Sequence, residues 1–363
     1  MHPLGKRLLA TSMIAAVAQV VGAPVVQQVS GPLNHGATLT VSGTGFGAKP
    51  TAAPLVWDDA SGNDISAKWD GAWPNSIASY NTGYHDPMRG VAPPHSHDSR
   101  YIVGNQYAPG VATAVPGGAV GGGNVVVFKN IKLQPFPFYV YASWYQRLDD
   151  AWSFGAVNNI KTFAYSACCS PYEAPNNWYT AYGPPHPTSN ADRGSQWVIT
   201  DDGKSLKDVN GHNAWWAHAA DTGKWSKEEV ALRVTDQPDG YIQVFENGNL
   251  VVNYRGPTDK YPGTARTIGI GGWSLVKAPN NWRYYADIYL DTSLSRVVLA
   301  NNATLSHATV IENQIPSSWS DGAITAKANL GQFQAGQTAY LFVVDSSGTP
   351  NSSGFPVSVG SGK

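Results

Sequence analysis

The sequence of 363 residues is poor in charge and in sulfur, and it has no long apolar run beyond its N-terminal segment. Charged residues make up 13% of the chain, the formal net charge is -1, and no run of Lys or Arg occurs. Nucleic-acid binding needs a basic surface that neutralises phosphates, so nucleic acid is not an expected partner. A bilayer-spanning helix needs about 20 apolar residues in succession, so the mature chain is not expected to span a membrane.

Only two cysteines occur, Cys168 and Cys169, and they are adjacent in the sequence. Neighbouring α-carbons are about 3.8 Å apart, which is below the usual separation in a disulfide. The pair therefore forms a strained vicinal disulfide, two unbridged thiols or an intermolecular bond. No Cys and His spacing typical of a zinc site is present.

The first residues, 1–18, are predicted to be a secretory signal peptide. Lys6 and Arg7 form a basic start, and the apolar run over residues 8–17 is too short to span a bilayer. The segment 16–18, Ala-Val-Ala, fits the rule of small residues at a cleavage site. We therefore expect a secreted or cell-surface protein; the alternative is a short buried segment of the mature chain.

The residues that are abundant favour strands and turns. The chain has 38 Gly, 25 Pro, 13 Trp and 18 Tyr, whereas helices prefer Ala, Leu, Glu and Lys. The length allows two domains, each with its own core. The sequence therefore predicts an all-β fold without long helices.

Residues 38–42 alternate polar and apolar side chains, the period of a half-buried strand, and a Gly-rich stop follows them. This start resembles an IPT/TIG domain, an immunoglobulin-like sandwich whose early strands have a G-x-x-L-T-V-x-G-x-x-F-G pattern. Its later strands are missing locally, but segments with their pattern occur at residues 315–328, 337–345 and 354–359. The resemblance implies one discontinuous immunoglobulin-like domain over residues 24–54 plus 296–360. The alternative is two separate small β units that flank the centre.

The central residues 55–295 contain a pattern of two strands joined by tight turns. It reads W-x-x-x-E-x-x-x-x-V, from Trp225 and Glu229, followed by D-G-x-I-x-V-x-x-N-G, which ends at Asn247-Gly248. This pattern resembles the concanavalin A-like jelly rolls of lectins, glucanases and polysaccharide lyases. The resemblance implies a jelly-roll sandwich, a fold that supports binding and catalytic proteins alike.

If the apolar residues of each alternating central strand face the core, the other residues lie on an exposed, concave face. That face is rich in Tyr, Arg, Lys, Gln and His, which suits stacking on sugar rings and pairing with uronate carboxylates. The core residues expected from segment 138–147 are Phe138, Val140, Ala142 and Trp144. The candidate concave-face residues are Tyr141, Tyr145, Arg147, Lys161, Tyr165, His218, Glu229, Arg233 and Gln243.

Three reaction types make different demands on this face. Retaining glycoside hydrolysis in this fold uses paired carboxylates in E-x-D-x-x-E, which the sequence lacks. Serine hydrolysis needs a G-x-S-x-G elbow, which is also missing. β-Elimination of a uronate polymer needs a Tyr or His base, a Tyr acid, and Arg, Gln or Asn to stabilise the intermediate. These residue types are present, but the alginate-lyase signatures R-x-E-x-R, Q-I/V-H and Y-x-K-x-G-x-Y-x-Q are not.

The expected function is therefore a secreted polysaccharide-active protein, namely a lyase that cleaves an acidic glycan. The catalytic candidates are His218, Tyr145 and Tyr141, and the substrate-binding candidates are Arg147, Lys161, Tyr165, Glu229, Arg233 and Gln243. A non-catalytic glycan-binding or adhesion protein, or a structural surface or filament protein, are the alternatives.

The jelly-roll resemblance also bears on metal binding. Many jelly rolls of the concanavalin A-like class hold a structural calcium near the two chain ends of the domain, so the resemblance implies such a site here. The candidate ligands are Asp58, Asp59, Asp287 and Asp291. The competing interpretation is that these aspartates are solvated or cap turns. His85, His95 and His97 suggest a second metal site, but a Pro-rich loop is the favoured interpretation there.

Overall fold

The computed structural model describes residues 22–59, 68–73, 101–103, 124–131, 135–148, 159–167, 176–182, 196–201, 204–205, 215–217, 223–259, 265–275 and 283–360. Within these residues the secondary structure is all β, as predicted, apart from one 3-10 turn, η2 (Leu305–His307). No helix in this part of the chain is long and apolar enough to cross a membrane. The predicted signal peptide, both cysteines, His85, His95, His97 and His218 lie outside the described residues.

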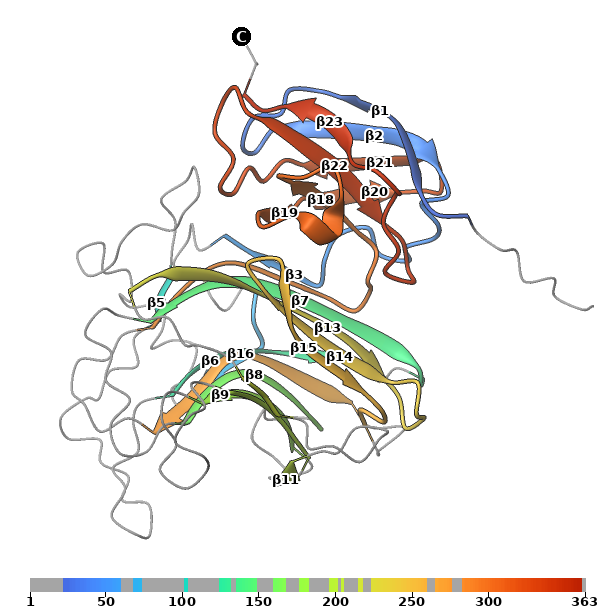
Figure 1. Ribbon diagram of the computed structural model, residues 1–363. Helices are drawn as coiled ribbons and strands as arrows, with labels where there is room; N and C mark the ends of the chain where they lie inside the picture. Colours follow the sequence, from blue (N-terminus) through green and yellow to red (C-terminus); the bar gives the residue numbers. More distant parts are fainter. Residues whose placement is uncertain are drawn as a thin grey trace, which may run out of the picture.

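Two four-stranded sheets pack face to face and form what we call the small sandwich, at the top of Figure 1. The first sheet has the order β1 (Val25–Ser30), β2 (Thr38–Thr44), β21 (Ala323–Lys327), β20 (Ile315–Trp319). The second has the order β19 (Ile311–Asn313), β18 (Arg296–Ala300), β22 (Thr338–Val344), β23 (Phe355–Ser358). The core of the small sandwich lies between the two sheets and joins Leu39 and Ile324 from the first to Leu299 and Leu341 from the second.

The small sandwich is built from both ends of the chain. Strand β2 pairs antiparallel with β21, so that Leu39 lies opposite Ala326 and Val41 lies opposite Ile324. Leu39 and Val41 are buried and their neighbours are not, which confirms the alternation predicted for this strand. Figure 1 accordingly shows blue N-terminal strands beside red C-terminal strands.

Two larger sheets form the large sandwich, below the small one in Figure 1. The eight-stranded sheet has the order β11 (Lys204–Ser205), β10 (Gln196–Asp201), β9 (Asn176–Tyr182), β8 (Asn159–Ala167), β16 (Arg266–Leu275), β6 (Asn124–Ile131), β4 (Gly71–Trp73), and β12 (Trp215–Ala217) pairs with β10. The seven-stranded sheet has the order β15 (Asn249–Arg255), β14 (Tyr241–Glu246), β13 (Trp225–Val234), β7 (Phe138–Leu148), β17 (Arg283–Asp291), β3 (Val56–Asp58), and β5 (Tyr101–Val103) pairs with β17.

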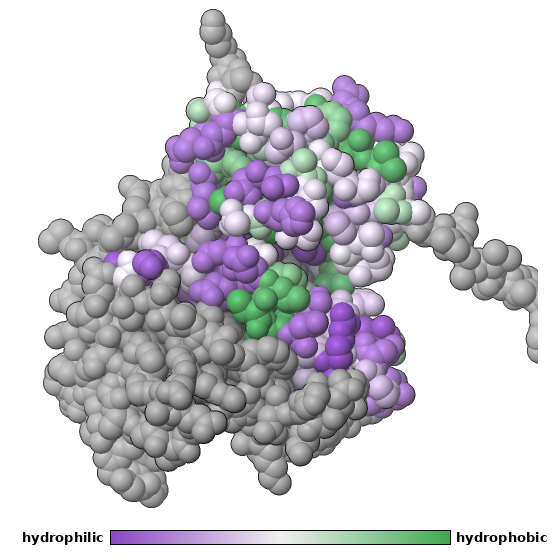
Figure 2. All heavy atoms as spheres, in the orientation of Figure 1, coloured by the Kyte–Doolittle hydropathy of each residue, from purple (hydrophilic) through white to green (hydrophobic). Residues whose placement is uncertain are grey.

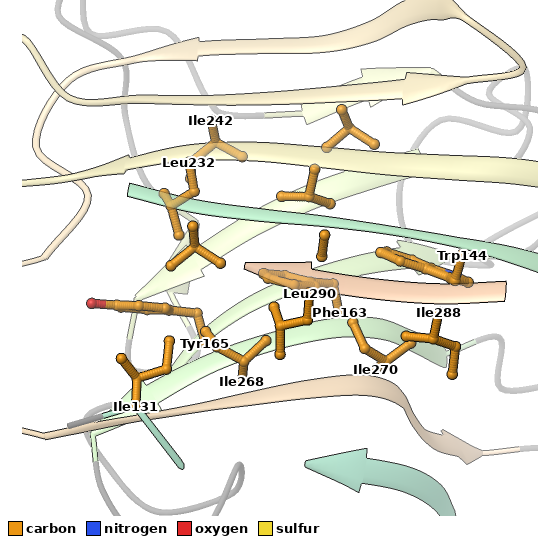
Figure 3. Close-up of a cluster of buried hydrophobic side chains, with 14 of the residues drawn as sticks. Ile131, Trp144, Phe163, Tyr165, Leu232, Ile242, Ile268, Ile270, Ile288 and Leu290 are labelled. Carbon is orange, nitrogen blue, oxygen red and sulfur yellow. The ribbon is translucent and has the colours of Figure 1, made fainter. Parts of the chain in front are cut away.

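Apolar side chains of both large sheets meet in one core, shown in Figure 3. The expected inward set of β7 is confirmed, because Phe138, Val140, Ala142 and Trp144 all belong to this core. The Trp144 ring stacks on Phe163 of the opposite sheet, with ring centroids 6.1 Å apart. Full burial of one such side chain stabilises a fold by about 1.5–3 kcal/mol, so these buried apolar side chains contribute strongly to holding the two sheets together.

Tyr165 was expected on the exposed face, and this expectation is wrong. Its side chain is 1% exposed and lies in the core with Phe163. A tyrosine ring is apolar enough to be buried once its hydroxyl has a partner. That partner is Asp259, whose Oδ2 accepts a 2.7 Å hydrogen bond from the Tyr165 hydroxyl.

Candidate functional site

The small sandwich covers part of the outer face of the seven-stranded sheet. Tyr141 and Tyr145 of β7 point away from the large core, yet each is only 1% exposed. Asn313 of β19 explains part of this burial, because its Nδ2 donates a 2.7 Å hydrogen bond to the Ser143 hydroxyl. The expectation that this part of the face is open to solvent is therefore wrong.

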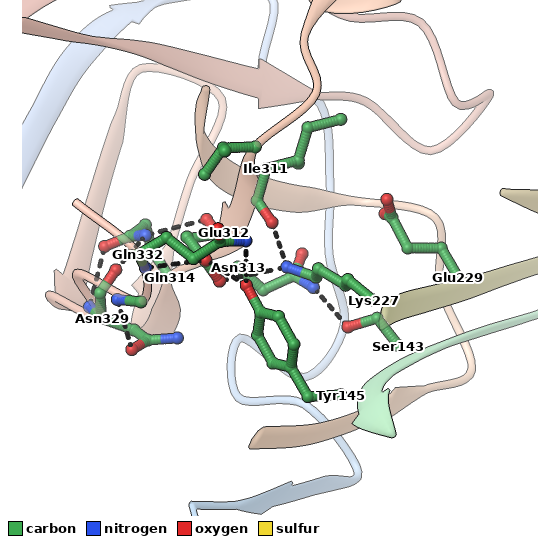
Figure 4. A network of polar contacts seen from close by, with 12 residues as sticks. Ser143, Tyr145, Lys227, Glu229, Ile311, Glu312, Asn313, Gln314, Asn329 and Gln332 are labelled. Atoms are coloured by element: carbon green, nitrogen blue, oxygen red, sulfur yellow. Dashed lines mark hydrogen bonds and ion pairs between the residues drawn. The ribbon is translucent and has the colours of Figure 1, made fainter. Parts of the chain in front are cut away.

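A buried polar network, which we call the seam network, joins the two sandwiches here (Figure 4). The Tyr145 hydroxyl donates to Glu312 Oε1 at 2.5 Å, and Lys227 Nζ lies 3.1 Å from Glu312 Oε2. Lys227 Nζ also donates to the Ile311 carbonyl oxygen. Gln332 completes the contact, since its Nε2 donates to the Tyr145 hydroxyl at 2.9 Å. The network ties β7 and β13 of the large sandwich to β19 and the loop before β22.

Burial is the largest cause of the raised pKa values of Glu312 and Tyr145 in this network. Burial raises the pKa of the Glu312 carboxyl, and the Lys227 ammonium offsets only part of the rise. Burial also raises the pKa of the Tyr145 phenol well above its ordinary value, and the Glu312 carboxylate raises it further. Tyr145 therefore keeps its proton at neutral pH and serves as a hydrogen-bond donor to Glu312.

Tyr141, four residues before Tyr145 on the same face of β7, is held in a similar way. Its hydroxyl donates to Glu229 Oε1 at 2.5 Å, and the Arg296 guanidinium lies 4.2 Å from its ring centroid. Burial first, and then the Glu229 carboxylate, raise the pKa of this phenol. Glu229 and Arg147 are also buried, at 4% and 3% exposure, so these candidate residues do not line a solvent-filled groove.

Another part of this outer face is half-buried or exposed among the described residues and holds what we call the arginine shelf. Ladder pairing places Tyr139, Arg233, Tyr241 and Arg255 directly opposite one another on four successive strands, β7, β13, β14 and β15. Residues opposite each other on a ladder share a face of the sheet. The shelf consists of Tyr139, Arg233, Tyr241, Gln243, Asn253 and Arg255, all half-buried or exposed.

Both charged side chains of the arginine shelf, Arg233 and Arg255, are cations. The Arg255 guanidinium lies 4.9 Å from the Tyr241 ring centroid, and Arg233 pairs with the exposed Asp239 at 2.7 Å. Burial and the neighbouring Tyr139 raise the pKa of the Tyr241 phenol, while the positive charges of Arg255, Arg233 and Arg296 lower it. Three guanidinium groups therefore act on one half-buried phenol. Figure 2 shows that the coloured surface at the boundary between the sandwiches is largely hydrophilic, with one hydrophobic (green) patch.

The predicted site residues therefore separate into groups. Arg233 and Gln243 lie together on the shelf, whereas Tyr141, Tyr145, Arg147 and Glu229 are buried, and Tyr165 is in the core. Lys161 is on β8, in the opposite sheet, and its side chain is outside the described residues, as is His218. The structure does not bring the nine candidates into one groove.

Three of the four aspartates proposed as calcium ligands contact a lysine, and Asp58 also accepts from a tryptophan. Asp58 accepts from Lys68 Nζ at 2.9 Å and from Trp69 Nε1 at 2.8 Å. Asp291 forms a buried ion pair with Lys49 at 2.7 Å. Asp59 lies 3.5 Å from the same Lys68, and Asp287 is buried at 4% exposure. Among the described residues no group of three or more His, Cys, Asp or Glu could hold a metal ion, so a calcium site built on Asp58 and Asp291 does not fit.

Sequence reasoning missed Glu312, Gln332, Arg255 and Arg296. Arg255 had a usable signal, because it ends an alternating strand and falls on the outward set of that strand. Glu312 and Gln332 had none, since their partners lie far away in the sequence and no local pattern connects them.

No protein-family model matches this sequence, and no curated protein matches it. Among solved structures, the alginate lyase Aly36B is similar at a TM-score of 0.40 and 12% identity, covering 67% of this chain and 98% of its own. An endo-beta-1,4-glucuronan lyase from the fungus Trichoderma reesei is similar at 0.41 and 13%, covering 66% and 96%. The carbohydrate recognition domain of Emp46p in its potassium-bound form is similar at 0.35 and 9%, covering 54% and 84%. These scores are too low to assign a fold family or an activity.

Proposed function

We propose that this protein binds an acidic polysaccharide on the arginine shelf, outside the cell or at its surface. The observation that carries the proposal is the row in which Tyr and Arg alternate across four neighbouring strands, from Tyr139 to Arg255. Neighbouring strands are about 4.8 Å apart, so the row of four residues extends about 14 Å across the sheet. A surface of this width suits an extended chain of sugars.

Charge favours an acidic ligand over a neutral one. The shelf holds Arg233 and Arg255, and Asp239, the acid that pairs with Arg233, is 57% exposed and readily displaced. The Arg255 guanidinium lies over the Tyr241 ring, which leaves less of that ring for stacking on a sugar. Guanidinium groups bind carboxylates through two parallel hydrogen bonds, so pairing with uronate carboxylates is the main expected contact.

Cleavage of the same ligand by β-elimination is the second candidate function. A base removes the proton next to the uronate carboxyl, the electron pair forms a carbon-carbon double bond, the bond to the leaving oxygen breaks, and an acid protonates that oxygen. Tyr241 suits the acid, because burial raises the pKa of its phenol and keeps it protonated. Tyr139, which lies on the other side of Arg233 on the shelf, is the candidate for the base, and the nearby arginines suit the negative charge that develops.

We propose the following domain organisation for such a protein. The small sandwich corresponds to a discontinuous immunoglobulin-like domain over residues 24–54 plus 296–360, and pairing of β2 with β21 supports this division. The large sandwich corresponds to a jelly-roll domain over residues 55–295. Residues 1–18 act as a signal peptide.

Binding and cleavage are tested together with a panel of polymers. Purified protein is titrated with polyuronates, with a neutral glucan and with the same polyuronate after its carboxyl groups are reduced to alcohols. We expect binding to the polyuronates only, and Arg233→Gln and Arg255→Gln each to weaken it about tenfold or more. Appearance of the ultraviolet absorbance of an unsaturated uronate would identify a lyase. Equal binding to the neutral and charged polymers would refute the proposal.

A further inference from the structure

Arg296 belongs to one sandwich and packs on the other. It is the first residue of β18 in the small sandwich, and its guanidinium lies 4.2 Å from the ring centroid of Tyr141 on β7. Its Nη1 donates a 2.9 Å hydrogen bond to the Leu294 carbonyl oxygen. These two contacts fix a half-buried guanidinium at the boundary between the sandwiches.

The charge of Arg296 is poorly matched by its surroundings. Its one described hydrogen bond goes to a neutral carbonyl, and its Nε is buried without a hydrogen-bond partner in the described part of the chain. In the described part of the chain no carboxylate forms an ion pair with Arg296: Glu229 accepts from the Tyr141 hydroxyl, and Asp291 pairs with Lys49. Charged side chains are rarely buried without a partner of opposite sign, so this position suits an anion.

Arg296 also lies beside the arginine shelf. The two residues that Arg296 contacts, Tyr141 and Leu294, pack in one apolar cluster with Tyr139 and Tyr241 of the shelf. The positive charge of Arg296, like those of Arg233 and Arg255, lowers the pKa of the Tyr241 phenol. The small sandwich therefore supplies a cation to a surface that is otherwise made by the large one.

We propose that Arg296 binds a carboxylate of the acidic ligand, so that the ligand contacts both sandwiches. This inference rests on the proposed function. It makes the small sandwich a part of the binding site, and it makes Arg296 a specificity residue for charged over neutral sugars. If the small sandwich were only a spacer, it would contribute nothing to the affinity for the acidic ligand.

The test is the affinity of the full-length protein for a polyuronate and for its carboxyl-reduced form. Arg296→Gln removes the charge at the boundary, and Lys327→Gln removes one charge from an exposed position of the same sandwich. We expect Arg296→Gln to weaken polyuronate binding about tenfold or more, because hydrogen bonds to charged groups are the strong ones. Lys327→Gln should change it by less than about twofold.

Arg296→Lys and the melting temperature separate binding from folding. If Arg296→Gln folds poorly, Arg296→Lys carries the test: it keeps the charge without the planar fork, so it should bind several-fold more weakly than wild type with a nearly unchanged melting temperature. A loss caused by Arg233→Gln but by neither Arg296 variant would overturn this inference and leave the proposed function standing. No loss from any of these variants would overturn both.

Discussion

Replacing Lys227 with Met should destabilise the protein strongly at neutral pH and much less in acid. The Lys227 and Glu312 side chains are only 6% and 1% exposed, and their charged atoms are 3.1 Å apart. Removing one member of such a pair leaves the other charge buried without compensation, which costs about 3–5 kcal/mol. The measurement is the free energy of unfolding from urea titrations of wild type and variant.

The pH dependence identifies the cause of this loss. Burial raises the folded-state pKa of Glu312, so the native state binds a proton more readily than the unfolded state does. The stability contributed by such a group is fully present below its unfolded pKa and is lost as the pH rises through its folded pKa. Without the Lys227 ammonium this folded pKa rises further, so Glu312 is neutralised at a higher pH. The destabilisation by Lys227→Met should therefore shrink steadily as the pH is lowered from 7 towards 5.

Two control variants test whether the buried charge of Glu312 causes the loss of stability. The double variant Lys227→Met, Glu312→Gln removes both charges and should recover much of the loss, because uncharged replacements of a buried pair are often tolerated. Lys224→Met changes an exposed lysine three residues before Lys227 and should cost less than about 0.5 kcal/mol. A loss in Lys227→Met that is the same at pH 7 and pH 5, or smaller than about 1 kcal/mol, would show that the Glu312 charge is not the cause.

Substitutions at Gly331 and at Asp259 test the effect of two other buried contacts on stability. Gly331→Ala should destabilise much more than Gly336→Ala in thermal melts, because both positions have positive φ but only at Gly331 would a Cβ clash with the Glu312 carboxyl. Equal losses of stability in the two variants would show that the positive φ, and not a clash with Glu312, causes the destabilisation. Asp259→Asn should cost about 3 kcal/mol in urea unfolding, since it leaves the buried Arg266 guanidinium, now paired at 2.5 Å, without its carboxylate. An unchanged unfolding midpoint would contradict this role.

The local sequence pattern alone determined which residues of the strands face a core. Alternation identified Val140, Ala142 and Trp144 on β7 and Leu39 and Val41 on β2, because the side-chain period of a strand is two whatever the strand packs against. It failed at Tyr165, where burial depended on a hydroxyl partner, Asp259, that lies far away in the sequence.

Only the tertiary structure decided what covers the opposite face. Tyr141 and Tyr145 have the alternation of exposed residues, and they are buried because β18, β19 and the loop at Gln332 return from the far end of the chain to lie over them. Their partner Glu312 has no local signal, since a hydrogen bond across 167 positions leaves no periodicity in the sequence. Arg233 and Gln243 have the same alternation, yet the structure leaves them half-buried. Alternation assigns a face to each residue, and long-range packing alone decides whether that face meets solvent.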